Sequence, residues 1–187
     1  MIKFDLDGTL IDLVSITDQF MVRSGFKRVR PQLQYRIKAV PEISKAQMWD
    51  IFYMVYDHWR ITPILDGAHQ IMEILWHLTA EPIQIITARP PKGVTSAVCI
   101  LNRIMMGIPY NIAFVDSAKD KYLHLGPDDV LVEDRRRTCL ELAEIGVRTV
   151  MIKNEYNEIP GKVPYITKIQ CLKDLIPLIP DLLSTNR

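Results

Sequence analysis

Short apolar segments recur along the chain, each bounded by charged or turn-forming residues and each as long as a buried strand. The longer stretches between them carry apolar residues three or four positions apart, which is the spacing of a helix with one buried face. The predicted strands are Ile2–Leu6, Ile83–Thr87, Asn111–Val115, Val130–Val132 and Arg148–Ile152. The helices predicted between them are Gly67–Leu78, Val94–Met106 and Arg136–Glu144.

Strands that alternate with helices of this length pair in parallel through right-handed crossovers. Short apolar strands of this kind are buried on both faces, as they are when helices cover a parallel sheet on both sides. The sequence therefore predicts an α/β fold built on a doubly wound parallel sheet. After the last predicted strand, the tail Cys171–Leu183 contains Pro177 and Pro180 and is expected to pack on the sheet as a broken helix.

One segment interrupts the alternation. Leu13–Pro63 contains no convincing strand, and it is too long to be a simple loop. Its pattern predicts helices over Ser15–Phe26 and Ile43–Trp59, with Pro31 and Pro41 marking breaks around a shorter helical piece. We therefore expect a core domain of residues 1–12 and 64–187, with residues 13–63 forming a helical cap. Ligands of such sheets bind at the carboxyl ends of the strands, where this insertion begins.

Composition limits the partners of the protein. The 187 residues are 48% hydrophobic and 24% charged, and 23 Lys and Arg against 22 Asp and Glu give a net charge of +1. This balance disfavours a polynucleotide or an anionic membrane as the partner. Lys3 and Asp5 interrupt the start of the chain, so a signal peptide is not expected there. Apolar runs fall short of the roughly 20 residues of a membrane span, and the cytoplasm is the expected location.

Two carboxylates stand at the end of the first predicted strand. Asp5 and Asp7 are separated by one residue, and Gly8 permits a sharp turn directly after them. Unpaired buried charges cost several kcal/mol, so such carboxylates seldom serve packing alone. A metal ion, or an anionic ligand with its counter-ions, would account for them. A solvated turn is the alternative reading of Asp7 and Gly8.

The string DLDGTL at residues 5–10 resembles the first motif of the haloacid-dehalogenase-like (HAD) superfamily, most of whose members are phosphatases. The superfamily has three further motifs, and each has a counterpart here in the same order. Thr87, in ITARP, ends a predicted strand, and Lys121 or Lys119 precedes the acidic motif. Glu133 and Asp134 then follow the apolar run Val130–Val132. The four motifs together span most of the chain, and jointly they are specific.

The resemblance implies a role for each of these residues. Asp5 would be the covalent nucleophile, forming an aspartyl phosphate, and Asp7 would act as general acid and then general base. Thr87 and the backbone amide of Ala88 would hold phosphoryl oxygens, while Lys121 would offset negative charge on the phosphoryl group. Magnesium, the expected cofactor, prefers oxygen ligands. Those ligands would be Asp5, the backbone carbonyl of Asp7, and Asp134, with Glu133 orienting Lys121 or a water on the metal.

The substrate is less well determined. A cap favours small phosphorylated metabolites, and DLDGTL with ITARP and VEDR is similar to the 5'(3')-deoxyribonucleotidase-like branch of the superfamily. A (deoxy)nucleoside monophosphate is therefore the leading candidate. Arg89 is assigned to a second anionic or sugar group of the substrate, or else to the surface. The last cap helix carries an aromatic run, from which one or two rings could stack on a base; its members are Trp49, Phe52, Tyr53, Tyr56 and Trp59.

Three alternatives stay open. Arg135–Arg137 also resembles the polynucleotide 3'-phosphatase branch, where basic residues would hold a nucleic-acid strand, although an exposed helix start explains them equally. A phosphatase of sugars or other metabolites is the second alternative. The third is a catalytically inactive descendant of the fold that binds phosphate or a protein partner.

Overall fold

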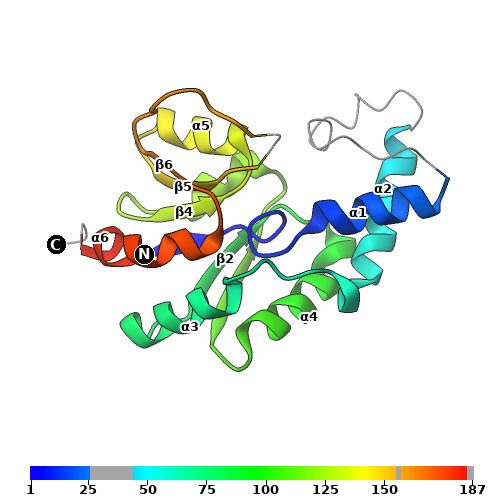
Figure 1. Cartoon of the computed structure of the whole chain (residues 1–187), viewed down its shortest axis with the longest axis horizontal. Helices are drawn as coiled ribbons and strands as arrows, with labels where there is room; N and C mark the ends of the chain where they lie inside the picture. The colour runs from blue at the N-terminus through cyan, green and yellow to red at the C-terminus, as the bar shows by residue number, and fades with distance from the viewer. Residues whose placement is uncertain (26–43, 155–156, 185–187) are drawn as a thin grey trace.

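The computed structural model describes residues 1–25, 44–154 and 157–184. Six parallel strands form one sheet in the order β3-β2-β1-β4-β5-β6 (Figure 1). The chain therefore winds outward from β1 in one direction and then from β4 in the other. Ligand sites of doubly wound sheets lie where the order reverses, here between β1 and β4. The predicted fold class is confirmed.

The strands agree closely with the sequence pattern. They are β1 Ile2–Phe4, β2 Ile83–Thr87, β3 Tyr110–Phe114, β4 Val130–Glu133, β5 Arg148–Ile152 and β6 Ile166–Ile169. The prediction missed β6, which pairs with β5 in parallel at the edge of the sheet. Of its four residues only Ile169 is buried, so the strand gives a weak periodic signal. β1 also ends at Phe4, two residues earlier than predicted.

Helices cover both faces of the sheet. The helices are α1 Leu13–Arg23, α2 Lys45–Asp57, α3 Ala68–Thr79, α4 Val94–Met105, α5 Arg136–Glu144 and α6 Ile179–Ser184. Short 3-10 helices join them at η3 Trp59–Ile61, η4 Pro91–Gly93, η5 Ala118–His124 and η6 Leu172–Leu178. α3 and α4 lie against one face, together with the broken C-terminal helix η6–α6, and α5 lies against the other (Figure 1).

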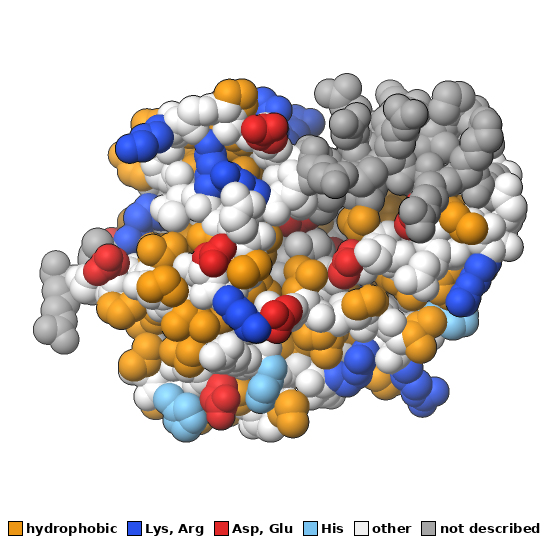
Figure 2. Space-filling model, in the orientation of Figure 1, with side chains coloured by type: hydrophobic (Ala, Val, Ile, Leu, Met, Phe, Trp, Pro, Cys, Tyr) orange, Lys and Arg blue, Asp and Glu red, His pale blue; other side chains and the backbone are white. Residues whose placement is uncertain are grey.

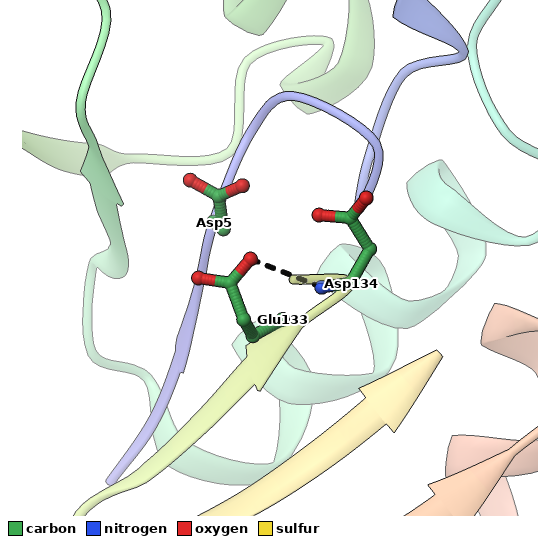
Figure 3. A group of neighbouring side chains, drawn as sticks. All are labelled: Asp5, Glu133 and Asp134. Carbon is green, nitrogen blue, oxygen red and sulfur yellow. Dashed lines mark hydrogen bonds between the residues drawn. The ribbon is translucent and has the colours of Figure 1, made fainter. Parts of the chain in front are cut away.

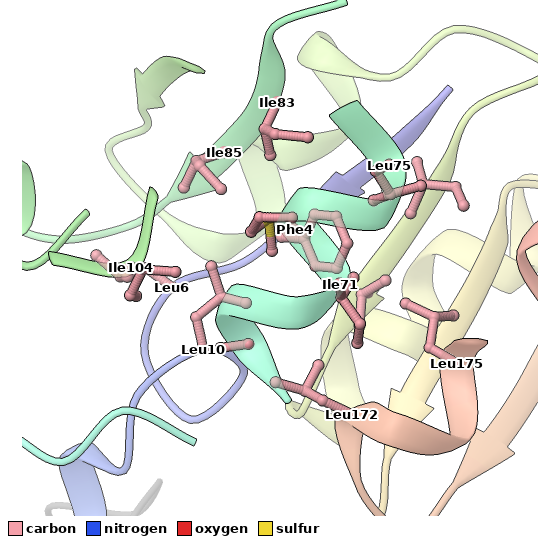
Figure 4. Close-up of a cluster of buried hydrophobic side chains, with 14 of the residues drawn as sticks. Phe4, Leu6, Leu10, Ile71, Leu75, Ile83, Ile85, Ile104, Leu172 and Leu175 are labelled. Carbon is pink, nitrogen blue, oxygen red and sulfur yellow. The ribbon is translucent and has the colours of Figure 1, made fainter. Parts of the chain in front are cut away.

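The main core lies under α3 and α4. Phe4 at its centre is fully buried, and side chains of β1, β2, β4 and β5 meet α3, α4 and η6 around it (Figure 4). On α3 the spacing predicted one buried face, and Ile71 and Leu75 lie on it. Leu78, at the same spacing, is exposed at the last turn of the helix. A smaller cluster under α5 contains Ile86 and Leu131, which point to the opposite face of the sheet.

The two helices that precede α3 pack on each other rather than on the sheet. α1 begins at Asp12, whose carboxylate accepts a hydrogen bond from Ser15 N at 2.9 Å. α2 begins at Ser44 with a reciprocal capping box to Gln47. Ile16, Met21, Met48, Ile51 and Val55 form a separate apolar cluster between the helices. We call these elements the α1–α2 pair. Phe26, Pro31, Pro41 and Ile43, to which helix ends and breaks were assigned, lie outside the described residues.

The chain enters and leaves the α1–α2 pair along two adjacent segments. Asp12 N donates to Pro63 O at 2.9 Å, and Leu65 N donates to Leu10 O at 2.9 Å. Ile11 and Ile64 form an antiparallel bridge between these two hydrogen bonds. The chain therefore enters the α1–α2 pair beside the segment along which it later leaves it.

Candidate active site

A buried network of charges joins the ends of β1 and β4. Asp5 follows β1 directly, and its amide donates to Val132 O at 2.9 Å, which extends the pairing of the two strands. Lys121, on η5, donates to Asp5 Oδ1 and to Glu133 Oε2, each at 2.7 Å. All three residues are 5% exposed or less. Lys119 is exposed. The structure therefore brings Lys121, and not Lys119, to Asp5.

Burial and charge act in opposite directions on this network. Burial raises the pKa of Asp5 to about 7, with Lys121 opposing the shift and Glu133 and Asp7 adding to it. Burial alone would lower the pKa of Lys121, but Asp5 and Glu133 raise it above its ordinary value. Lys121 therefore stays charged at neutral pH. A second positive charge near Asp5 would bring its raised pKa back down and favour the ionised carboxylate.

Three buried carboxylates meet at this point. Asp5, Glu133 and Asp134 each offer an oxygen atom, and these atoms lie within 4.8 Å of one another. Figure 3 shows the three groups converging from the end of β1 and the end of β4. Gly8 lies against them, because a Cβ there would be 2.2 Å from Asp134 Oδ2. An all-oxygen donor set with excess negative charge suits magnesium, so these residues fit the expected ion.

Glu133 has a second function in the local fold. While Oε2 accepts from Lys121, Oε1 accepts from the amides of Asp134 and Arg135 at 3.1 and 3.0 Å. It thus fixes both the lysine and the turn that follows β4. The expectation that Glu133 orients Lys121 agrees with this geometry. No motif or periodicity pointed to Asn157, whose buried amide donates to the backbone carbonyls of Asp134 and Ile152.

A cavity of about 160 Å³ opens onto these residues. The sheet side of its wall includes Asp5, Asp7, Thr87, Ala88, Lys121 and Asp134. Thr87 ends β2 and is 1% exposed, and its hydroxyl has no hydrogen-bond partner among the described residues. A buried hydroxyl left in this state is expected to meet a ligand. Residues predicted from four separate motifs therefore line one cavity.

Asp7 and Arg89 form a second ion pair beside the first, in which Arg89 is buried and Asp7 is partly exposed. Arg89 Nε donates to both carboxylate oxygens of Asp7, at 3.0 and 2.9 Å, and a terminal nitrogen donates to Oδ1 at 2.6 Å. Its other terminal nitrogen donates to Ser96 Oγ at 2.9 Å. Arg89 is 3% exposed, so its alternative assignment to the surface is wrong. Ser96, which the sequence analysis did not single out, lies in the first turn of α4.

The α1–α2 pair forms the other wall of the cavity. Its contribution is mostly apolar and consists of Leu13, Val14, Thr17, Asp18, Met48 and Phe52. Of the described part of the aromatic run on α2, Phe52 alone lines the cavity. Trp49 and Tyr53 stack on each other, and the ring of Tyr56 lies 4.5 Å from the guanidinium of Arg89. Tyr56 is the buried member of the run, and the other four rings are partly exposed.

The surface carries no strong bias of charge on the face shown in Figure 2, where acidic, basic and hydrophobic side chains are interspersed. Arg136 and Arg137, at the start of α5, are exposed, and Arg137 pairs with Glu141 one turn later at 2.7 Å. Arg135 instead lines the cavity. Among the helices of the described residues, none has the length and apolar character needed to cross a membrane.

No model of a known protein family matches the chain, and no curated protein sequence does so either. Solved structures match over nearly the whole length. A provisionally assigned phosphatase from Clostridium difficile is 17% identical with a TM-score of 0.65, covering 95% of this chain and 97% of its own. Protein Tyrosine Kinase A of Mycobacterium tuberculosis is 18% identical with a TM-score of 0.65, covering 95% and 96%.

A third structure, a HAD hydrolase of family IA, variant 3, from Entamoeba histolytica, is 16% identical with a TM-score of 0.63, and the match covers 98% of each chain. One of the three proteins is named as a kinase, so likeness of fold does not decide the activity. The likeness does identify the architecture. The chain has the Rossmann-like α/β fold of the HAD-superfamily hydrolases.

Proposed function

We propose that the protein is a magnesium-dependent phosphatase of small phosphate monoesters. The observation that carries the proposal is the convergence of Asp5, Asp7, Thr87, Lys121 and Asp134 on one cavity at the point where the strand order reverses. A carboxylate nucleophile, a second carboxylate, a hydroxyl donor and a buried cation are the groups that phosphoryl transfer requires. The HAD-type fold of the chain supports the same reaction class.

In the proposed reaction, an oxygen of Asp5 attacks the phosphorus atom, and the bond to the leaving oxygen breaks. Asp7 gives a proton to that oxygen, so that a neutral alcohol leaves. Asp7 then takes a proton from water as the water attacks the aspartyl phosphate, which releases inorganic phosphate and restores Asp5. Thr87 and the backbone amide of Ala88 donate hydrogen bonds to phosphoryl oxygens, and Lys121 offsets their charge.

Magnesium, held by Asp5, Asp134 and the backbone carbonyl of Asp7, would neutralise charge on the carboxylates and on the phosphoryl group. Glu133 would act indirectly, because both of its oxygens are engaged by Lys121 and by backbone amides. Its buried position beside the other carboxylates makes it the residue that keeps Lys121 at Asp5. We further propose that residues 13–63 act as a cap over a core of residues 1–12 and 64–187.

The cap wall supports a substrate with one phosphate and a ring. Leu13, Val14, Met48 and Phe52 offer apolar surface, and Phe52 can stack on a base. Among its described residues, Asp18 is the charged group that this wall contributes to the cavity. We therefore propose a nucleoside or deoxynucleoside monophosphate as the substrate class, with phosphate monoesters of neutral alcohols as the wider group.

Hydrolysis of 4-nitrophenyl phosphate, measured with magnesium and with a chelator, tests the reaction class. Turnover should require magnesium and should disappear in Asp5→Asn, and rapid acid quenching of the active protein should trap a phosphoryl group on Asp5. Turnover of the native protein that does not exceed the Asp5→Asn background would exclude the phosphatase. A protein that only binds phosphate would instead bind the ester without releasing nitrophenol.

A substrate screen tests the second part of the proposal. Deoxy- and ribonucleoside monophosphates, sugar phosphates and a 3'-phosphorylated oligonucleotide should be compared by kcat/KM. The highest values are expected for the nucleoside monophosphates. A preference for sugar phosphates with no nucleotide turnover would contradict the substrate class while leaving the reaction class intact.

A further inference from the structure

Arg89 is held in one orientation by contacts on all sides of its guanidinium. Its Nε and one terminal nitrogen make three hydrogen bonds to Asp7, and the other terminal nitrogen donates to Ser96. Ser96 Oγ in turn donates to Gly93 O at 2.9 Å. The side chain of Arg89 has no exposed surface. A planar guanidinium bound in this way fixes the plane of the carboxylate that it contacts.

The part of the Asp7 carboxylate that Arg89 does not engage faces the cavity. An ionised carboxylate has about four acceptor positions, and Arg89 fills three of them. The Asp7 side chain keeps 21% of its surface exposed and lines the cavity with Asp5. One position is therefore left toward the cavity, where Asp7 would carry the proton that it gives as an acid and would accept a proton from water as a base. Arg89 itself is absent from the cavity wall formed by the described residues, so it reaches that space only through Asp7.

The α1–α2 pair contributes one face of this assembly. Tyr56, on α2, is 5% exposed, and its ring centre lies 4.5 Å from Arg89 Cζ in a cation–π contact. Gly93 allows the ring and the arginine to approach the backbone, since a Cβ there would be 3.1 Å from Tyr56 and 3.4 Å from Arg89. The guanidinium is thus enclosed by β2, the start of α4 and the α1–α2 pair.

We propose that Arg89 is a positioning residue for proton transfer by Asp7, and that Tyr56 holds Arg89 in place from the cap. This inference rests on the proposed function, because it takes Asp7 as the acid and base of the phosphatase. Arg89 orients the Asp7 carboxylate so that its open position meets the leaving oxygen. The α1–α2 pair then contributes to the chemistry as well as to substrate binding, because Asp7 is aligned only when α2 packs against Arg89.

The dependence on the leaving group separates positioning from general stability. kcat/KM reports the steps up to release of the alcohol, in which Asp7 protonates the leaving oxygen. An alkyl phosphate needs that proton, whereas 4-nitrophenyl phosphate leaves as a stable anion and does not. Loss of general acid catalysis costs about 10²–10⁴-fold for a substrate that needs it. A defect in Asp7 or in its alignment should therefore lower kcat/KM far more for the alkyl substrate.

Arg89→Lys is the first variant to test, since it keeps the charge but cannot make the three bonds to Asp7. We expect kcat/KM to fall at least about tenfold more for the alkyl phosphate than for 4-nitrophenyl phosphate, in the same direction as Asp7→Asn. Tyr56→Leu should also lower kcat/KM more for the alkyl phosphate than for 4-nitrophenyl phosphate, but by a smaller factor. Tyr56→Phe, which keeps the ring, should have the native ratio of the two kcat/KM values. Thermal denaturation of each variant establishes that it is folded.

Lys92→Met supplies a matched control. Lys92 is exposed and makes a cation–π contact at 4.6 Å with Tyr53, which lies on α2 as Tyr56 does. Its removal should leave the ratio of the two kcat/KM values unchanged. If Asp7→Asn discriminates between the substrates while folded Arg89→Lys and Tyr56→Leu lower both equally, the positioning role is refuted and the phosphatase stands. If Asp7→Asn itself does not discriminate, the acid role of Asp7 fails, and the inference fails with it.

Discussion

Gly8→Ala offers a direct test of the carboxylate cluster. Gly8 has a φ of +85°, and a methyl group at this position would lie 2.2 Å from Asp134 Oδ2 and 2.5 Å from Asp134 Cγ. Asp134 is 1% exposed, and Asn157 binds its backbone carbonyl, so the backbone cannot retreat freely. The methyl group therefore must displace the Asp134 carboxylate from the cluster.

Gly146→Ala separates this collision from backbone strain. Gly146 has a φ of +79°, and a methyl group there would meet no atom within 4 Å. Both substitutions place alanine in the left-handed region, which costs about 1–2 kcal/mol. In Gly8→Ala the steric overlap adds about 1–3 kcal/mol, the usual cost of overpacking. Since 1 kcal/mol shifts the Tm of a chain of this length by about 2–4 °C, the two variants should differ measurably without magnesium.

Magnesium then distinguishes a metal ligand from an ordinary buried residue. An ion that binds only the folded state at 100 times its Kd stabilises that state by about 2.7 kcal/mol. The native protein and Gly146→Ala should show the same rise in Tm on addition of magnesium. Gly8→Ala should show little or none, because Asp134 has left the site. An equal rise in Gly8→Ala and Gly146→Ala would refute the assignment of Asp134 to the metal.

Three further predictions concern the other walls of the site. Asp5→Asn should stabilise the metal-free protein at neutral pH. Because the pKa of Asp5 is raised in the folded state, the native protein loses stability as pH rises from about 4 to about 7, and asparagine avoids this loss. Thermal melts in chelator should therefore show a higher Tm for Asp5→Asn at pH 8 but not at pH 4. Lys121→Met should lower the free energy of unfolding by about 3–5 kcal/mol by stranding buried carboxylates, whereas exposed Lys119→Met should change it by less than about 0.5 kcal/mol in urea denaturation. Phe52→Ala should raise KM for a nucleoside monophosphate more than for glycerol phosphate; equal effects in steady-state kinetics would argue against a ring contact.

Much of the fold was predictable because the apolar pattern is local. β2, β5 and α5 have the bounds that the sequence predicted. The edge strand β6 was missed because a four-residue strand with one buried residue produces little periodicity, and because its place is decided by pairing with β5. Parallel pairing joins segments that are distant in sequence, and no pattern within β6 itself specifies its partner.

The candidate site was predictable to the extent that its residues follow strands. Asp5, Thr87, Glu133 and Asp134 come at or just after the carboxyl ends of β1, β2 and β4, which parallel pairing brings to one edge. Lys121 required the structure, since η5 presents Lys121 inward and Lys119 to solvent. A difference of two residues on a short helix reverses the side that a lysine faces.

The sequence by itself therefore determined where the candidate groups stand along the chain: carboxylates and a hydroxyl at the ends of predicted strands, with Lys119 or Lys121 before the last acidic pair. Only the tertiary structure decided how those groups are paired. Arg89 binds Asp7 across 82 positions and meets Tyr56 from the α1–α2 pair, although each residue alone also suits a surface or a core. The physical reason is that local patterns report which side of an element is buried. The partner of a buried charge depends instead on which distant element fills the space beside it.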